Sequence, residues 1–316
     1  MDNIGKPLQI FLCLIYLIFF PGIFHPQDKS QAVDKLLTEL YNAGKFQGSV
    51  LIGNDSGIFY EKGFGYANLE FDIPNTPETK FRIASITKSF TSMLVMQFVQ
   101  EGKLKLDAII KNYLPEYPAK TGSIITIHQL LSHTSGLGHY EVVPDFFRLH
   151  SYLPYIHNDF IKLFQDAPLL FEPGARYSYS SFGYYLLGVI LEKVSGKSYE
   201  ELLNGRILNM LGMKNTSVDN SRRIETNRAN GYEKTVSGLQ NAGYRSMSTA
   251  LAAGDMLSTV RDLYLWDRAL YNDKLLSARF REIMFRPNTG GYGYGWSVNK
   301  IKLSNGRILR TVSHTG

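Results

Sequence analysis

The order of apolar and polar residues predicts a helix followed by a β-hairpin near the start of the chain. Apolar residues recur at helical spacing through residues 31–41, and Gly44 follows as a stop signal. Residues 46–52 and 58–65 are short runs of strand-forming residues, separated by the turn-forming segment 53–57. The two runs are therefore expected to pair as a hairpin.

Helical patterns and long loops fill residues 103–252. The clearest helix is predicted over residues 182–194, where apolar positions repeat at helical spacing and Gly196 supplies the stop signal. A further helix is predicted over residues 261–270. The middle of the chain is therefore expected to be mainly helical.

The C-terminal part of the chain returns to a strand pattern. Residues 292–298 and 307–314 are predicted strands, joined by a turn at residues 304–306. Strands at both ends favour one antiparallel sheet flanked by helices, with the helical middle as an inserted lobe, which is an α+β fold. Because the chain stops in mid-strand at Gly316, which would leave an unpaired edge, we expect it to be truncated at its C-terminus.

An apolar run at residues 8–20 predicts an export signal. It follows Lys6, has the length of a signal-peptide core, and favours a cleaved signal peptide over residues 1–26. This predicts a periplasmic or extracellular location for the remaining domain, residues 27–316. The alternative is an uncleaved membrane anchor, since no charge occurs between Lys6 and Asp28.

Composition restricts the classes of protein. The chain has 316 residues, of which 44% are hydrophobic and 20% charged, as expected for one large or two intertwined globular domains. The net charge is +6, but the basic residues are scattered and their densest group, from residue 221 onward, is interrupted by Glu225, so we expect no nucleic-acid site. The single cysteine, Cys13, excludes a disulfide in the mature domain. Histidines such as His139 and His157 lack metal-ligand spacing, so surface or packing roles are expected.

Ser85 and Lys88 form an S-x-x-K pattern that can activate a nucleophile. Apolar residues recur at helical spacing from Phe90 onward, and residues i and i+3 share one face of a helix. A lysine can take a serine proton if desolvation or a nearby cation lowers its pKa. The pattern is short enough to occur by chance. A second copy, Ser297 to Lys300, lies on a predicted strand, where the two side chains would point to opposite faces.

Two further clusters offer groups for proton transfer and substrate binding. Tyr179 lies in residues 171–181, just before a predicted helix, and a tyrosine beside a nucleophile can relay a proton. The alternative is a packing role, since the chain has 20 tyrosines. His314, Thr315 and Gly316 lie at the tip of a predicted strand, where a cation and a backbone edge can meet an extended anionic substrate.

The order of these three clusters resembles the serine β-lactamase and penicillin-binding protein superfamily. The class C β-lactamase-like branch is the most similar, and it also includes D-aminopeptidases, D-alanyl-D-alanine carboxypeptidases and esterases. Residues 130–137, 171–174 and 253–259 are similar to segments typical of this branch. The resemblance extends from about residue 31 to the end of the chain, and it implies a β-lactamase-like fold.

The resemblance implies a role for each cluster. Ser85 would be the acylated nucleophile and Lys88 its proton acceptor. Tyr179 matches the tyrosine of the Y-x-N motif, and it would work with Lys88 to move protons to the leaving group and later to activate water. His314 matches the first residue of the K-T-G motif, and Thr315 would bind or flank the substrate carboxylate.

The chain departs from the pattern of the superfamily at two positions. Ser181 occupies the asparagine position of Y-x-N, and its shorter side chain offers less to a substrate amide. His314 is a weaker cation than lysine, which suits esters or amine-free peptides at least as well as β-lactams. Gly316 completes the substrate-binding set, and one oxyanion N–H is expected beyond it. Residues 133–136 follow a helix and are expected to form a structural turn.

The resemblance implies an exported serine hydrolase that forms an acyl-enzyme with an ester, a D-amino-acid peptide or a β-lactam. No metal or cofactor is expected. The expected partner is a small molecule or a peptidoglycan-like peptide, with no nucleic acid, and with a membrane only if the N-terminal segment stays uncleaved. The alternative is a catalytically silent relative that binds peptidoglycan or a protein partner through the same cleft.

Overall fold

The computed structural model describes residues 26–316. The predicted signal peptide, except for Pro26, lies outside the described residues. Within the described part of the chain, no helix is both long and apolar enough to cross a membrane.

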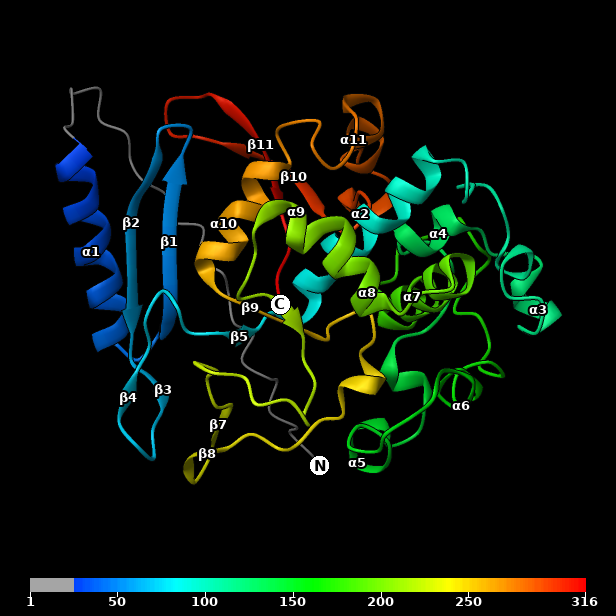
Figure 1. The fold of residues 1–316 in the computed structure, drawn as a ribbon, viewed down its shortest axis with the longest axis horizontal. Coiled ribbons are helices and arrows are strands. Elements are labelled where there is room, and N and C mark those ends of the chain that lie inside the picture. The colour runs from blue at the N-terminus through cyan, green and yellow to red at the C-terminus, as the bar shows by residue number, and fades with distance from the viewer. Residues whose placement is uncertain (1–25) are drawn as a thin grey trace.

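Runs of strands and runs of helices follow one another in a mixed α+β arrangement (Figure 1), which confirms the predicted fold class. The strands are Gly48–Asn54 (β1), Gly57–Phe64 (β2), Tyr66–Asn68 (β3), Ile73–Pro74 (β4), Phe81–Arg82 (β5), Ser217–Val218 (β6), Tyr232–Thr235 (β7), Gly238–Asn241 (β8), Met256–Ser258 (β9), Ser297–Lys302 (β10) and Ile308–Ser313 (β11). The α-helices are Pro26–Asn42 (α1), Thr87–Gln100 (α2), Ala119–Gly122 (α3), Ile127–Leu131 (α4), Phe146–Leu149 (α5), His157–Lys162 (α6), Ser181–Ser195 (α7), Tyr199–Leu203 (α8), Asn209–Leu211 (α9), Val260–Ala269 (α10) and Ala278–Met284 (α11).

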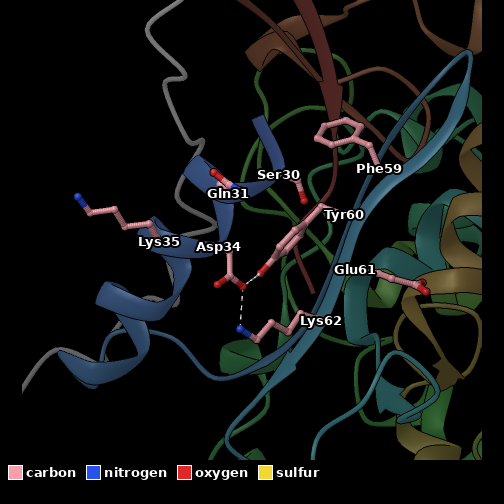
Figure 2. Close-up of a pocket in the computed structure, with 8 residues that line it drawn as sticks. All are labelled: Ser30, Gln31, Asp34, Lys35, Phe59, Tyr60, Glu61 and Lys62. Atoms are coloured by element: carbon pink, nitrogen blue, oxygen red, sulfur yellow. Dashed lines mark hydrogen bonds and ion pairs between the residues drawn. The ribbon is translucent and has the colours of Figure 1, made fainter. Parts of the chain in front are cut away.

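The N-terminal helix and hairpin form as predicted. Strands β1 and β2 pair antiparallel, and α1 packs against them through a small apolar cluster that includes Leu37 and Phe64. A polar contact adds to this packing (Figure 2): Tyr60 Oη and Lys62 Nζ donate to Asp34 Oδ1 over 2.9 and 2.7 Å. A hollow of about 580 Å³ lies beside this contact, between α1 and β2. None of the predicted site residues lines it.

The helical lobe is built around α2 and α7. Almost every residue of α2 is buried, as is most of α7, because these two helices pass through the main core and bury all their faces. Ser180 caps α7, its hydroxyl accepting from the N–H of Gly183, and Gly196 ends the helix in the left-handed region at φ 69°. These ends agree with the predicted helix over residues 182–194.

The C-terminal strands differ from the prediction in extent and pairing. Strand β10 begins only at Ser297, because Gly295 adopts φ 75° and a Cβ there would lie 2.7 Å from the carbonyl oxygen of Lys88. The segment before β10 is thus a turn pressed against α2. The predicted sheet joining both ends is not formed by the described strands: β1 pairs with β2, and β10 pairs with β11, as separate hairpins.

Candidate active site

Strand pairing places Ser85 beside the segment just before β9. In the short sheet β5–β9–β6, β5 and β9 run antiparallel, with Arg82 opposite Leu257 and the N–H of Ile83 donating to Met256 O over 3.0 Å. Extending this register brings residues 84–85 beside Gly254, and an added Cβ on that glycine would lie 3.6 Å from the Ala84 backbone. The segments around residues 85 and 253, far apart in sequence, are therefore neighbours.

Ser85 lies just before α2, in a single 3-10 turn, Ala84–Ile86, that leads into the helix. Ala84 adopts φ 40°, a left-handed conformation that L residues rarely take. Two more non-glycine residues at positive φ flank the same site, Ala252 at 57° and His133 at 57°. Such strained backbone is held in place by surrounding structure and is concentrated at functional sites.

Lys88 is fully buried and its amine has three neighbours. Nζ lies 2.9 Å from Ser85 Oγ, 3.2 Å from Ser181 Oγ and 2.6 Å from the carbonyl oxygen of Ala253. A neutral amine has two N–H groups and one lone pair. With the N–H groups directed to Ala253 and Ser181, the lone pair is left for the proton of Ser85.

Burial decides the charge of this lysine. Desolvation lowers the pKa of Lys88 from 10.5 to about 7, and the nearby Asp255 opposes the shift only in its ionised form. Burial raises the pKa of Asp255 itself to about 8, so this carboxyl is largely protonated at neutral pH. Asp255 Oδ1 accepts from the N–H of Ala252 over 3.1 Å, next to the Ala253 carbonyl that binds Lys88. Asp255 thus stabilises the turn that positions the amine.

Tyr179 lies next to the Ser85–Lys88 pair. Lys88 Nζ is 4.9 Å from the centroid of the Tyr179 ring. Burial raises the pKa of Tyr179 well above its usual value, and a hydrogen bond with Ser85 partly offsets this. The phenol is therefore protonated at neutral pH. A protonated phenol can donate a proton to a departing group, whereas only a phenolate could act as a base.

Two histidines, His133 and His139, accept hydrogen bonds from the backbone beside Tyr179. From the sequence, His133 was expected in a structural turn and His139 in a surface or packing role. The N–H of Ser180 donates to His133 Nδ1, and the N–H of Ser181 donates to His139 Nδ1, each over 3.1 Å. Desolvation lowers the pKa of both histidines, so both are neutral acceptors. The ring of His133 lies 4.4 Å from that of Tyr179 between centroids. The histidines therefore fix the backbone that presents Tyr179 and Ser181.

His314 lies beside Tyr179 but carries no charge at neutral pH. Its Nε2 is 2.8 Å from Tyr292 Oη and its Nδ1 is 2.6 Å from the carbonyl oxygen of Thr315. Burial lowers the pKa of His314 to about 4. Thr315 is exposed, and a Cβ on Gly316 would lie 2.3 Å from Ile83 O, so the end of the chain runs close beside the segment that carries Ser85.

A cavity of about 350 Å³ opens at Ser85, and Tyr179, Ser181 and His139 line it. His139 thus lines a ligand-sized cavity, whereas the sequence led us to expect only a surface or packing role for it. No group of three or more His, Cys, Asp or Glu side chains in the described residues could hold a metal ion. The predicted residues Ser85, Lys88, Tyr179 and Ser181 converge at one place, and the ring of His314 lies 6.4 Å from that of Tyr179 between centroids.

Known proteins are similar to this chain in sequence and in architecture. A family model described as Beta-lactamase matches residues 33–316. The protein PbpX of Bacillus subtilis (strain 168) is 30% identical over 288 residues, covering 89% of this chain and 68% of that protein. The octameric penicillin-binding protein homologue from Pyrococcus abyssi is 31% identical with a TM-score of 0.76, over 89% of this chain and 67% of that one.

An amidase is also similar. The D-amino acid amidase from Ochrobactrum anthropi SV3, solved with D-phenylalanine, is 26% identical with a TM-score of 0.73, over 91% of this chain and 84% of that one. The family match includes every described residue of the candidate site. This chain belongs to the beta-lactamase family, a family of serine hydrolases.

Proposed function

We propose that this protein is an acyl-transferring serine hydrolase whose nucleophile is Ser85. The observation that carries the proposal is the buried amine of Lys88, 2.9 Å from Ser85 Oγ, with its pKa lowered by burial to about 7. A base acts best when its pKa lies near the working pH. In its neutral form this amine can accept the serine proton.

The geometry supports a simple sequence of steps. Ser85 Oγ bonds to the substrate carbonyl carbon while its proton moves to Lys88. The bond to the leaving group then breaks, and the leaving group takes a proton from Tyr179, which Lys88 re-protonates. Water cleaves the resulting acyl-enzyme by the reverse proton path. The ammonium formed at Lys88 faces the Tyr179 ring at 4.9 Å, a favourable cation–π distance.

The substrate class is an ester, a D-amino-acid amide or peptide, or a β-lactam. The similarity to a penicillin-binding protein homologue and to a D-amino acid amidase supports this set. Within it, the neutral His314 and the short side chain of Ser181 favour esters and simple amides over β-lactams. A β-lactam carboxylate beside His314 would meet no cation there at neutral pH.

Covalent labelling tests the nucleophile. A fluorescent fluorophosphonate should label the wild type, and Ser85→Ala should abolish the label. The matched control is Ser297→Ala, because Ser297 and Lys300 repeat the S-x-x-K pattern on β10. Labelling that persists in Ser85→Ala, or that is lost in Ser297→Ala, would contradict the proposal.

A substrate panel tests the reaction. p-Nitrophenyl esters, D-alanyl p-nitroanilide and nitrocefin should be compared on wild type and Ser85→Ala, with intact-mass measurement of any adduct. We expect Ser85-dependent turnover, fastest for an ester or amide. Ser85 that is never acylated by any of the panel or by the probe would favour the silent, binding-only role instead.

We also propose that the protein is exported, on the apolar run at residues 8–20. Amino-terminal sequencing of the protein recovered outside the cytoplasm would test cleavage near residue 26. Recovery only from the cytoplasm would contradict export.

A further inference from the structure

The cavity at Ser85 has a mixed apolar and cationic lining. One wall is aromatic, formed by Tyr140, Phe146 and Phe147, and Met247 adds an apolar surface. Its volume of about 350 Å³ falls at the lower end of the range for small-ligand pockets, roughly 300–1,000 Å³. An apolar chain attached to Ser85 would therefore find a matching surface.

The charges that line the cavity are all of one sign. Two arginines, Arg82 and Arg245, line it, and none of the lining side chains is an aspartate or glutamate. Arg82 is held in an ion pair, since its Nε donates to Asp219 Oδ2 over 2.6 Å, and Arg228 pairs with the same carboxylate. A ligand anion would therefore have to compete with Asp219 for Arg82.

Arg245 is different. Within residues 26–316 it makes no ion pair, and its guanidinium carbon lies 4.7 Å from the centroid of the Phe147 ring. Stacking on a ring fixes the plane of a guanidinium while its N–H edges remain free to donate. Its charge also reaches into the cavity: burial raises the pKa of Tyr140 to about 12, and Arg245 acts in the opposite direction.

Nearby groups do not compete for an anion. Lys88 is buried, and its amine must be neutral to take the serine proton. His314 is neutral and is not among the side chains that line the cavity. Of the two arginines that line the cavity, Arg245 is therefore the one that makes no ion pair within residues 26–316.

We propose that this cavity binds the acyl part of a substrate whose far end is a carboxylate, which pairs with Arg245. The inference rests on the proposed role of Ser85. We assign the cavity to the acyl part because that part stays attached to Ser85 through both half-reactions, whereas the leaving group must depart after the first. An apolar chain against the aromatic wall, ending in a carboxylate at a planar guanidinium, satisfies both surfaces of the cavity.

Kinetics with matched esters test this specificity. The p-nitrophenyl monoesters of adipate and suberate should be compared with the neutral hexanoate and octanoate esters, each corrected for hydrolysis without enzyme. In the wild type, kcat/KM should favour the anionic ester by about tenfold or more, as one charged pair predicts. Arg245→Gln should remove that preference, and Arg245→Lys should retain part of it.

Arg279→Gln is the matched control. Arg279 is also an exposed arginine stacked on a phenylalanine, with its guanidinium 5.7 Å from the Phe280 ring, but it does not line the cavity. This variant should keep the wild-type preference. An equal preference for anionic and neutral esters in the wild type, or a preference that survives Arg245→Gln, would overturn the inference while leaving Ser85 as nucleophile.

A binding measurement separates this inference from the proposed reaction. Calorimetry of monomethyl suberate with Ser85→Ala needs no turnover. Adding Arg245→Gln should weaken binding by about tenfold or more if the carboxylate pairs with Arg245. Equal affinity in the two variants would refute the inference, whether or not Ser85 is acylated.

Discussion

Acidification is expected to stop acylation of Ser85 by protonating Lys88. Burial lowers the pKa of this lysine to about 7, so its amine is half neutral near that pH. At about pH 5 only about 1% of the amine is neutral, and each pH unit corresponds to about 1.4 kcal/mol. The rate of acylation should therefore fall about 100-fold from its plateau, with a slope of one logarithmic unit per pH unit.

The rate of fluorophosphonate labelling, measured under single-turnover conditions, reports this step directly. The wild type should show one ionisation near pH 7 and a plateau above it. An ordinary lysine would instead give a rate that still rises toward about pH 10. A histidine base at this site would place the ionisation below the ordinary histidine pKa of about 6.5, since burial lowers the pKa of both His133 and His139. Either result would refute the assignment of Lys88 as the base.

Three further substitutions test the groups around the nucleophile. Lys88→Met should slow labelling by about 10²–10⁴-fold yet raise the free energy of unfolding by about 1–3 kcal/mol, because burying the amine is costly. The sign follows from its lowered pKa: between pH 7 and 10.5 the native state binds fewer protons than the unfolded state, so the lysine destabilises the fold fully below pH 7 and less toward pH 10.5. A less stable Lys88→Met at pH 6 would contradict this. Asp255→Asn should lower the free energy of unfolding by under about 1 kcal/mol at neutral pH, since the carboxyl is already largely protonated. Asp255→Ala should lower it by about 1–3 kcal/mol and slow labelling, because the Ala252 N–H loses its acceptor. An equal loss of stability in the two variants, measured by thermal unfolding, would contradict this. Ser180→Ala should cost about 1 kcal/mol or more in chemical unfolding, because it removes the cap of α7 and a bond of 2.8 Å to Gly138 O, and an unchanged midpoint would show that the cap contributes nothing.

Local pattern was enough to predict the elements that local interactions stabilise. The N-terminal helix and hairpin depend on neighbouring residues and a tight turn, and the helix over residues 182–194 depends on its own apolar periodicity and a terminal glycine. The strand predicted at 292–298 was wrong at residues 292–296, since β10 begins at Ser297. There, close packing of Gly295 against α2 forces a left-handed turn that the alternating pattern does not reveal.

Some residues of the candidate site could likewise be predicted from local sequence, and others could not. The approach of Ser85 to Lys88 follows from a spacing of three along one helical turn. Tyr179 and Ser181 were indicated by motif order, while Asp255 and the hydrogen-bonding roles of His133 and His139 were missed, because each acts through backbone groups brought together only by folding.

The sequence by itself determined which groups are present and which local elements carry them. Only the tertiary structure decided their charge. Lys88 becomes a base because α7 and the turn before β9 remove it from water, and His314 loses its charge because its environment is buried. Desolvation depends on atoms contributed by distant segments, and the periodicity of one segment contains no information about them.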